Sequence, residues 1–138
     1  MKKYYWDSSA IINAAVSDAV AERLETDVHL ARAHNFSEFF AIMTGRGIEI
    51  PALGARAVWS PKDARRWLRD FASKVTIVDL SAEEWLDGLE QAGSNVVGAC
   101  VYDYGHALAA VKAGADVVLT RNRSDFEGLI GTAVIEHP

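Results

Sequence analysis

The sequence of 138 residues contains one cysteine, Cys100, so no intrachain disulfide is possible. Cys100 lies between Ala99 and Val101, an apolar setting that predicts a small core residue. No apolar stretch approaches the roughly 20 residues that a membrane-spanning helix needs. The two N-terminal lysines are followed by no apolar segment of the kind found in signal peptides. These absences predict a cytoplasmic protein without a membrane anchor.

The sequence also lacks an excess of basic residues. Lys and Arg number 14 against 19 Asp and Glu, which gives a formal net charge of −5. This balance argues against binding of nucleic acid by bulk attraction, but it leaves room for an enzyme with a local basic surface and a metal ion. The length and the 50% apolar content fit one globular domain, residues 1–138.

Strand-like and helix-like segments alternate along the chain. Strands are expected at 4–6, 28–33, 75–80, 115–119 and 133–136. Helices are expected at 8–25, 36–44, 62–73, 81–92 and 96–113, and the second and third of these suggest an extra helical layer or arm. Such alternation is typical of an α/β fold with a mainly parallel sheet.

Four carboxylates occur where the local pattern favours another residue. Asp7 and Asp125 each follow a predicted strand, and Glu38 and Asp103 lie in apolar helical segments. Each has an ordinary alternative: Asp7 and Asp125 as caps, Glu38 in a capping box with Asn35, and Asp103 as an exposed helix position. Together they are better explained by a hard divalent cation, Mg²⁺ or Mn²⁺, because carboxylates gathered without a cation repel one another.

The four histidines show no zinc-site spacing. His29, His34, His106 and His137 are scattered, and each is expected to be structural or exposed. His106 follows Asp103 by three residues and so lies on nearly the same helix face, where it can support the site. No Ser/His/Asp or Cys/His set indicates covalent catalysis.

Four segments, YYWDSSAII, NFSEFFA, VYDYGHALAA and VVLTRNRSDFEGL, resemble in order and approximate spacing the motifs of PIN-domain ribonucleases. The resemblance is closest to the VapC-type toxins of type II toxin–antitoxin pairs, and it covers essentially the whole chain. It implies a three-layer α/β/α sandwich with a mainly parallel central sheet and Mg²⁺- or Mn²⁺-dependent cleavage of RNA. It also implies a small VapB-like antitoxin as partner and a homodimer.

Carried over position by position, the resemblance assigns Asp7, Glu38 and Asp103 to the first three acidic positions of the family. The fourth position is open. Many relatives have an acid where this chain has Asn122, whereas others keep Asn there and use the Asp of an Asp-Phe pair, here Asp125. We favour Asp125, with Asn122 as a supporting ligand to water or substrate.

Two hydroxyl residues, Ser9 and Thr120, match positions that border the metal-bound water in the family. A cation in such a site lowers the pKa of the water and stabilises charge on the scissile phosphate, so no nucleophilic side chain is required. Asp116 opens its strand rather than ending it, and it is expected to be structural.

A basic strip is expected on the helix at 62–73. Its residues are spaced i, i+3, i+4 and i+7, and at about 100° per residue they share one face opposite the apolar residues. The strip is either a solvated face or an RNA-binding surface, which Arg46, Arg121 and Arg123 would extend towards the metal site. Trp59 and Trp67 either stack on bases or, as we favour, pack in the core or an interface. The strip consists of Lys62, Arg65, Arg66 and Arg69.

Two other functions fit parts of the pattern. A PIN-type nuclease with a housekeeping role in RNA or DNA processing would have the same site, and an upstream gene for a small DNA-binding antitoxin would favour the toxin instead. A non-catalytic α/β binding or signalling module would need a phosphorylatable Asp and a Lys near the last strand, but no Lys follows the final strand. We therefore predict a metal-dependent endoribonuclease acting as a toxin.

Overall fold

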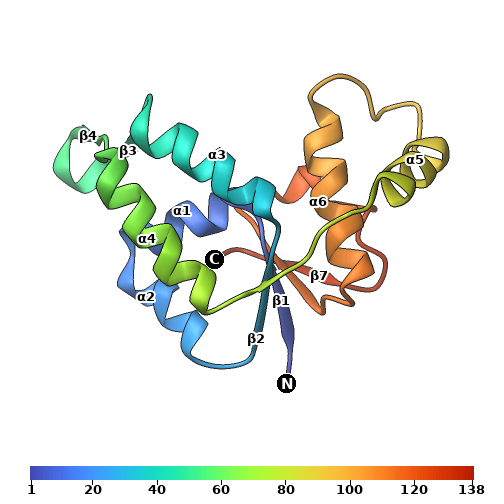
Figure 1. Ribbon diagram of the computed structural model, residues 1–138, viewed down its shortest axis with the longest axis horizontal. Helices are drawn as coiled ribbons and strands as arrows, with labels where there is room; N and C mark the ends of the chain where they lie inside the picture. The colour runs from blue at the N-terminus through green and yellow to red at the C-terminus, as the bar shows by residue number, and fades with distance from the viewer.

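The computed structural model describes residues 1–138, and its centre is a five-stranded sheet in the order β5-β2-β1-β6-β7 (Figure 1). Every neighbouring pair in this sheet is parallel. The predicted α/β fold with a parallel sheet is therefore confirmed. The strands are β1 (Lys3–Trp6), β2 (Val28–Ala31), β5 (Thr76–Ile77), β6 (Val117–Leu119) and β7 (Val134–Glu136).

Helices cover both faces of the sheet and make three layers (Figure 1). Successive side chains of a strand point to opposite faces. Trp6 accordingly packs in one core with Phe39 and Phe71, while its neighbour Tyr5 packs in a second core with Ala107. None of the helices combines the length and the apolar character that crossing a membrane requires. One side holds α1 (Ser8–Val16), α2 (Asp18–Ala21), α3 (Ala33–Thr44) and α4 (Pro61–Ser73), and the other holds α5 (Ala82–Gln91) and α6 (Cys100–Lys112).

The segment 8–25, predicted as one helix, is divided. Helix α1 ends at Val16, and Ser17 adopts an extended conformation with φ −140° and ψ 115°. The Ser17 side chain accepts a hydrogen bond from the backbone N–H of Val20 and so caps α2. A 3₁₀ turn, Glu22–Glu25, completes the connection to β2. The prediction of a continuous helix was wrong because a serine hydroxyl competes with helical backbone bonding.

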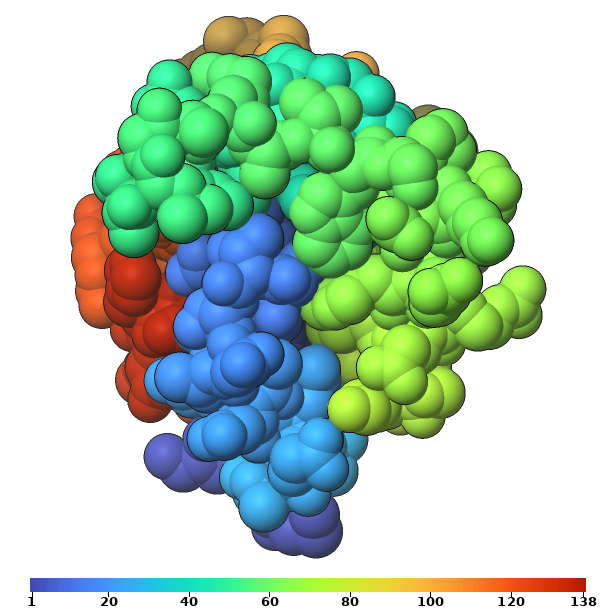
Figure 2. Space-filling model, turned by 90° about the vertical axis from the view of Figure 1, so that its left-hand side faces the viewer, coloured from blue at the N-terminus to red at the C-terminus, as the bar shows by residue number.

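Helices α3 and α4 form the expected extra helical layer, but a β-hairpin that the sequence did not predict joins them. Its strands are β3 (Ile48–Ile50) and β4 (Ala55–Ala57), which pair antiparallel. Gly54 closes the turn with φ +59°, a conformation that favours glycine. Figure 2 shows α1, in blue, set back between this hairpin segment and α4.

The two tryptophans of this layer pack as favoured. Trp67 stacks on Phe39 with ring centroids 4.9 Å apart, and Trp59 meets the same ring edge-on at 5.9 Å. Two other expectations were wrong. Helix α6 begins at Cys100 rather than at residue 96, and Cys100 is exposed rather than part of the core. Strand β5 is also shorter than the predicted 75–80, with two residues.

Candidate functional site

The carboxyl ends of β1 and β6 lie side by side at the centre of the sheet. From β1 the chain continues to β2 and β5 on one side, whereas β6 and β7 lie on the other, so the strand order reverses between β1 and β6. Open parallel sheets bind ligands outside the strand ends at such a point. The backbone N–H of Asp7, which follows β1, donates to the carbonyl of Leu119 over 3.0 Å. The sheet therefore brings the first and last motifs together, as predicted.

The hydroxyl groups at this edge hold the carboxylate of Asp7. Asp7 occupies the N-cap position of α1, but its side chain makes no capping hydrogen bond. Instead Oδ2 accepts hydrogen bonds from Ser9 Oγ and Thr120 Oγ1, both at 2.9 Å. Those hydroxyls in turn accept backbone N–H groups from Arg121 and Asn122, both at 3.0 Å. The hydroxyl of Thr120, at the end of β6, thus orients the carboxylate that follows β1 and also bonds to the backbone of its own turn.

Glu38 reaches the same edge from α3. The alternative role of Glu38 in a capping box with Asn35 is wrong. The helix begins one turn earlier, and Asn35 itself accepts the backbone N–H of the N-cap residue, Arg32, through Oδ1 at 2.8 Å. Asn35 Nδ2 donates to Ser8 Oγ, and Ser8 Oγ donates to Glu38 Oε1, each over 2.9 Å. A hydrogen-bonded chain from Asn35 through Ser8 therefore fixes Glu38 relative to α1.

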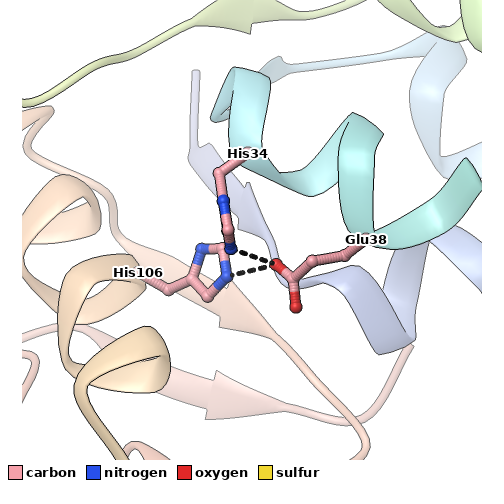
Figure 3. Close-up of side chains that lie close together, drawn as sticks. All are labelled: His34, Glu38 and His106. Atoms are coloured by element: carbon pink, nitrogen blue, oxygen red, sulfur yellow. Dashed lines mark hydrogen bonds and ion pairs between the residues drawn. The ribbon is translucent and has the colours of Figure 1, made fainter. Parts of the chain in front are cut away.

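Two histidines that look unrelated in the sequence meet at Glu38 (Figure 3). His106 is buried on α6, with Nε2 2.8 Å from Glu38 Oε1 and Nδ1 2.8 Å from the hydroxyl of Tyr5. His34 lies one turn before Glu38 on α3, and its Nε2 is 3.5 Å from the same oxygen. Burial alone would raise the pKa of Glu38, but the hydrogen bond and charge of His106 bring it below its ordinary value. The sequence held two signals: the i, i+4 spacing of His34 and Glu38, and the i, i+3 spacing of Asp103 and His106, which placed His106 near the site.

Asp103 completes the group from α6. Burial raises its pKa to about 6, and the negative charges of Asp125, Asp7 and Glu38 add to the rise, while the charge of His106 partly offsets it. The four predicted carboxylates, named here the carboxylate cluster, therefore lie close enough for the other three to disfavour the charged form of Asp103. Their mutual repulsion is the kind that a bound cation relieves.

A cavity of about 610 Å³ opens over this edge of the sheet and is lined by Asp7, Glu38, Asp103 and Asn122. Asp125 lies instead in an adjoining recess of about 160 Å³, which Asp103 also lines. The two candidates for the fourth position thus occupy different places: Asn122 in the main cavity and Asp125 beside Asp103.

Arginines supply the positive charge of the main cavity. Arg46 and Arg121, both predicted, line it together with Arg56, which the sequence did not suggest because it lies on the hairpin. Arg56 Nη1 donates to the carbonyls of Arg46 and Gly47 at 2.9 and 3.1 Å, and Nη2 lies 3.4 Å from Glu49. Arg56 therefore closes the hairpin at the mouth of the cavity. The basic strip is exposed on α4 as predicted, but it does not line this cavity.

Other polar residues have structural roles. Asp116 Oδ2 accepts the backbone N–H of Lys3 at 2.8 Å, which confirms its predicted role. His29 Nδ1 accepts a hydrogen bond from Trp6 Nε1 at 3.0 Å. Arg123 donates to the carbonyl of Ile135 at 2.9 Å, so it ties η3 (Arg123–Asp125) to β7, and it does not line the main cavity.

The fold has a counterpart among solved structures. No protein-family model matches the chain, and no curated protein matches it. The chain is similar to one in the crystal structure of VapBC2 from Rickettsia felis bound to a DNA fragment from its promoter. The TM-score is 0.67, the match covers 99% of this chain and 98% of that chain, and 14% of the residues are identical. This chain therefore shares the PIN-like α/β fold that its four motifs predicted.

Proposed function

We propose that this chain is a divalent-cation-dependent endoribonuclease and the toxin of a type II toxin–antitoxin pair. The observation behind the proposal is the carboxylate cluster, whose members come from four separate segments: Asp7, Glu38 and Asp103 line one cavity, and Asp125 lies beside Asp103 in the adjoining recess. The cluster lies where the strand order reverses, which is the usual ligand position of an open parallel sheet.

The chemistry of the donor set fits Mg²⁺ or Mn²⁺, which prefer oxygen ligands. Asp7 uses only Oδ2 for its hydrogen bonds and Glu38 only Oε1, so each keeps an oxygen for a cation. The pKa of Asp103 is raised to about 6, and a nearby positive charge would stabilise the ionised form of this carboxylate. When bound, the cation supplies Lewis acidity that activates water and offsets charge on the scissile phosphate.

The protein's own groups prepare this site before RNA binds. Ser9 and Thr120 hold one oxygen of Asp7, so the carboxylate needs little reorganisation. Arg46 and Arg121 line the cavity, where their charge would favour RNA phosphates over the acidic average of the chain. The neutral amide of Asn122 would orient water or substrate at the same wall.

The proposed partners are an RNA substrate, a small VapB-like antitoxin and a second copy of the chain. The similarity to a chain of a VapBC2 assembly supports the antitoxin. We also propose that the chain acts in the cytoplasm, where it would meet both RNA and the antitoxin.

Mapping of RNA ends tests the nuclease proposal. The purified chain should make internal cuts in RNA with Mg²⁺ or Mn²⁺ and none with EDTA, and Asp103→Asn should abolish them while remaining folded. Asp87→Asn, which changes an exposed carboxylate on α5, is the matched control and should cleave normally. If the folded wild type cuts no RNA with either cation, the nuclease proposal is wrong.

Expression in cells tests the toxin proposal separately. The chain expressed alone should arrest growth, and co-expression with the gene immediately upstream should relieve the arrest. A chain that cleaves RNA in vitro but causes no arrest would instead be a nuclease with a housekeeping role.

A further inference from the structure

Three side chains at one wall of the site form a donor set that differs from the carboxylate cluster. His34 and Glu38 lie four residues apart on one face of α3, and His106 comes from α6. One donor atom from each lies within 4.8 Å of the others. Figure 3 shows both imidazoles directed at the same oxygen of Glu38, with the second oxygen turned away from them.

We propose that His34, Glu38 and His106 form a second cation site, the histidine site, which binds a borderline transition ion of the Zn²⁺ class. The inference goes beyond the proposed nuclease function and does not depend on it. Imidazole nitrogen suits Zn²⁺, Ni²⁺ and Cu²⁺, whereas Mg²⁺ takes oxygen ligands. Two imidazoles and one carboxylate also leave a fourth position of a tetrahedral ion open.

The distances require only small movements. Zn²⁺ bonds of about 2.0–2.1 Å place tetrahedral donors about 3.3 Å apart. The Glu38 oxygen is 2.8 Å from His106 Nε2 and 3.5 Å from His34 Nε2, so both pairs are already near this spacing. All three donor atoms lie within 4.8 Å of one another. Any adjustment falls to His34, whose side chain is 39% exposed, because His106 is held in the core at 1%.

The surroundings of His106 favour ligation. Metal-binding histidines almost always use their second ring nitrogen for a hydrogen bond that fixes the ring. His106 has this partner, because its Nδ1 lies 2.8 Å from the buried hydroxyl of Tyr5. With Nε2 on a cation, Nδ1–H would donate to the Tyr5 oxygen. The ring of His34 lies nearly parallel to that of Tyr102, with centroids 5.8 Å apart and an interplanar angle of 17°.

Glu38 would then belong to two sites. Its Oε1 faces the histidines, and its Oε2, which makes no hydrogen bond, remains for the carboxylate cluster. Because both sites use one carboxylate, an ion in the histidine site lies beside the proposed Mg²⁺ position. The two histidines could instead serve only to orient Glu38 by hydrogen bonds, and that role would need no ion. Measurement of cation binding therefore distinguishes a cation site from a purely orienting role.

Co²⁺ is the spectroscopic probe for this site, used with the full-length protein carrying no polyhistidine tag. The wild type should bind one Co²⁺ with visible d–d absorption, which Zn²⁺ displaces and the same concentration of Mg²⁺ does not. His34→Ala should lose the absorption and weaken Zn²⁺ binding at least about tenfold in calorimetry. His137→Ala removes an exposed histidine outside the site and should behave as the wild type.

Two further variants define the site. Tyr5→Phe keeps the ring but removes the partner of His106, and it should weaken Zn²⁺ binding about 10–100-fold. Asp103→Asn should keep the Co²⁺ absorption whether or not the wild type cleaves RNA, so this proposal and the nuclease proposal can fail independently. No absorption from the folded wild type, or equal absorption from wild type and His34→Ala, would overturn the histidine site.

Discussion

Replacing Asp103 by Asn should stabilise the cation-free protein at neutral pH. Burial and the neighbouring charges of Asp125 and Asp7 raise the pKa of Asp103 from 3.8 to about 6. Because the pKa is higher in the folded state, the unfolded chain loses this proton more easily. Stability therefore falls as the pH rises from about 4 through 6. Asn has nearly the same shape without the charge, so it removes this loss.

The size of the effect follows from the pKa of Asp103. At about 1.36 kcal/mol for each pKa unit, the rise in pKa from 3.8 to about 6 corresponds to a loss of about 3 kcal/mol in the free energy of unfolding. The side chain is only partly buried, so solvent screening reduces this value, and we expect a gain of about 1 kcal/mol at pH 7.5. That gain raises the unfolding midpoint by about 3–5 °C for a chain of this size. At pH 4.5 the folded carboxyl is protonated, and the gain should fall to about a third.

Thermal and urea unfolding in EDTA at the two pH values measure the prediction. Asp87→Asn, on the exposed face of α5, is the control and should change stability little at either pH. Adding Mg²⁺ should stabilise the wild type more than Asp103→Asn, because a ligand that binds only the folded state adds stability according to its affinity. Equal stability of wild type and Asp103→Asn at pH 7.5, or an equal gain at both pH values, would refute the reasoning.

Three further predictions concern the edge of the site and the basic strip. Asp125→Asn should lower the rate of cleavage at low Mg²⁺ more than Asn122→Ala does, because a carboxylate binds a hard cation better than an amide. Its activity should recover partly at high Mg²⁺, and the reverse order of the two variants in metal titrations would move the fourth position to Asn122. Thr120→Val removes a hydroxyl that donates to the carboxylate of Asp7, so kcat for RNA cleavage should fall. The free energy of unfolding should fall by about 0.5–1.5 kcal/mol. An unchanged kcat would show that this hydrogen bond is dispensable for cleavage. The double change Arg65→Glu with Arg69→Glu should weaken RNA binding and flatten its salt dependence, whereas unchanged binding at several salt concentrations would assign the strip to solvent.

Features that depend on contacts within a few residues could be predicted from the sequence. The capping box before α5 is present: Ser81 Oγ accepts the N–H of Glu84 at 3.1 Å, and Glu84 accepts the N–H of Ser81 at 2.9 Å. Pro61 opens α4, where the N–H it lacks would have no partner. The parallel sheet could also be predicted, because strands that alternate with helices along the chain are typical of parallel α/β sheets.

Elements whose pattern is short, or continues across a boundary, could not be predicted from the sequence. The hairpin strands β3 and β4 have three residues each, too few for alternation to show. The helical pattern of 96–113 runs through Gly98, whose φ of +57° lies outside the helix, so α6 starts later and Cys100 becomes exposed. In both places the conformation depends on how the segment packs rather than on its composition.

The sequence predicted some features of the carboxylate cluster, whereas others depended on the tertiary structure. Residue type and position after strands identified Asp7 and Asp125 as candidates, because parallel strands end at a common edge. Only the tertiary structure decided that Thr120 hydrogen-bonds to Asp7, 113 residues away, and that His106 reaches Glu38, 68 residues away. Such contacts depend on the register of β1 against β6 and on the approach of α3 to α6 at the sheet edge. Residues that far apart leave no periodic signal in a single sequence, so the histidine site becomes visible only once the chain is folded.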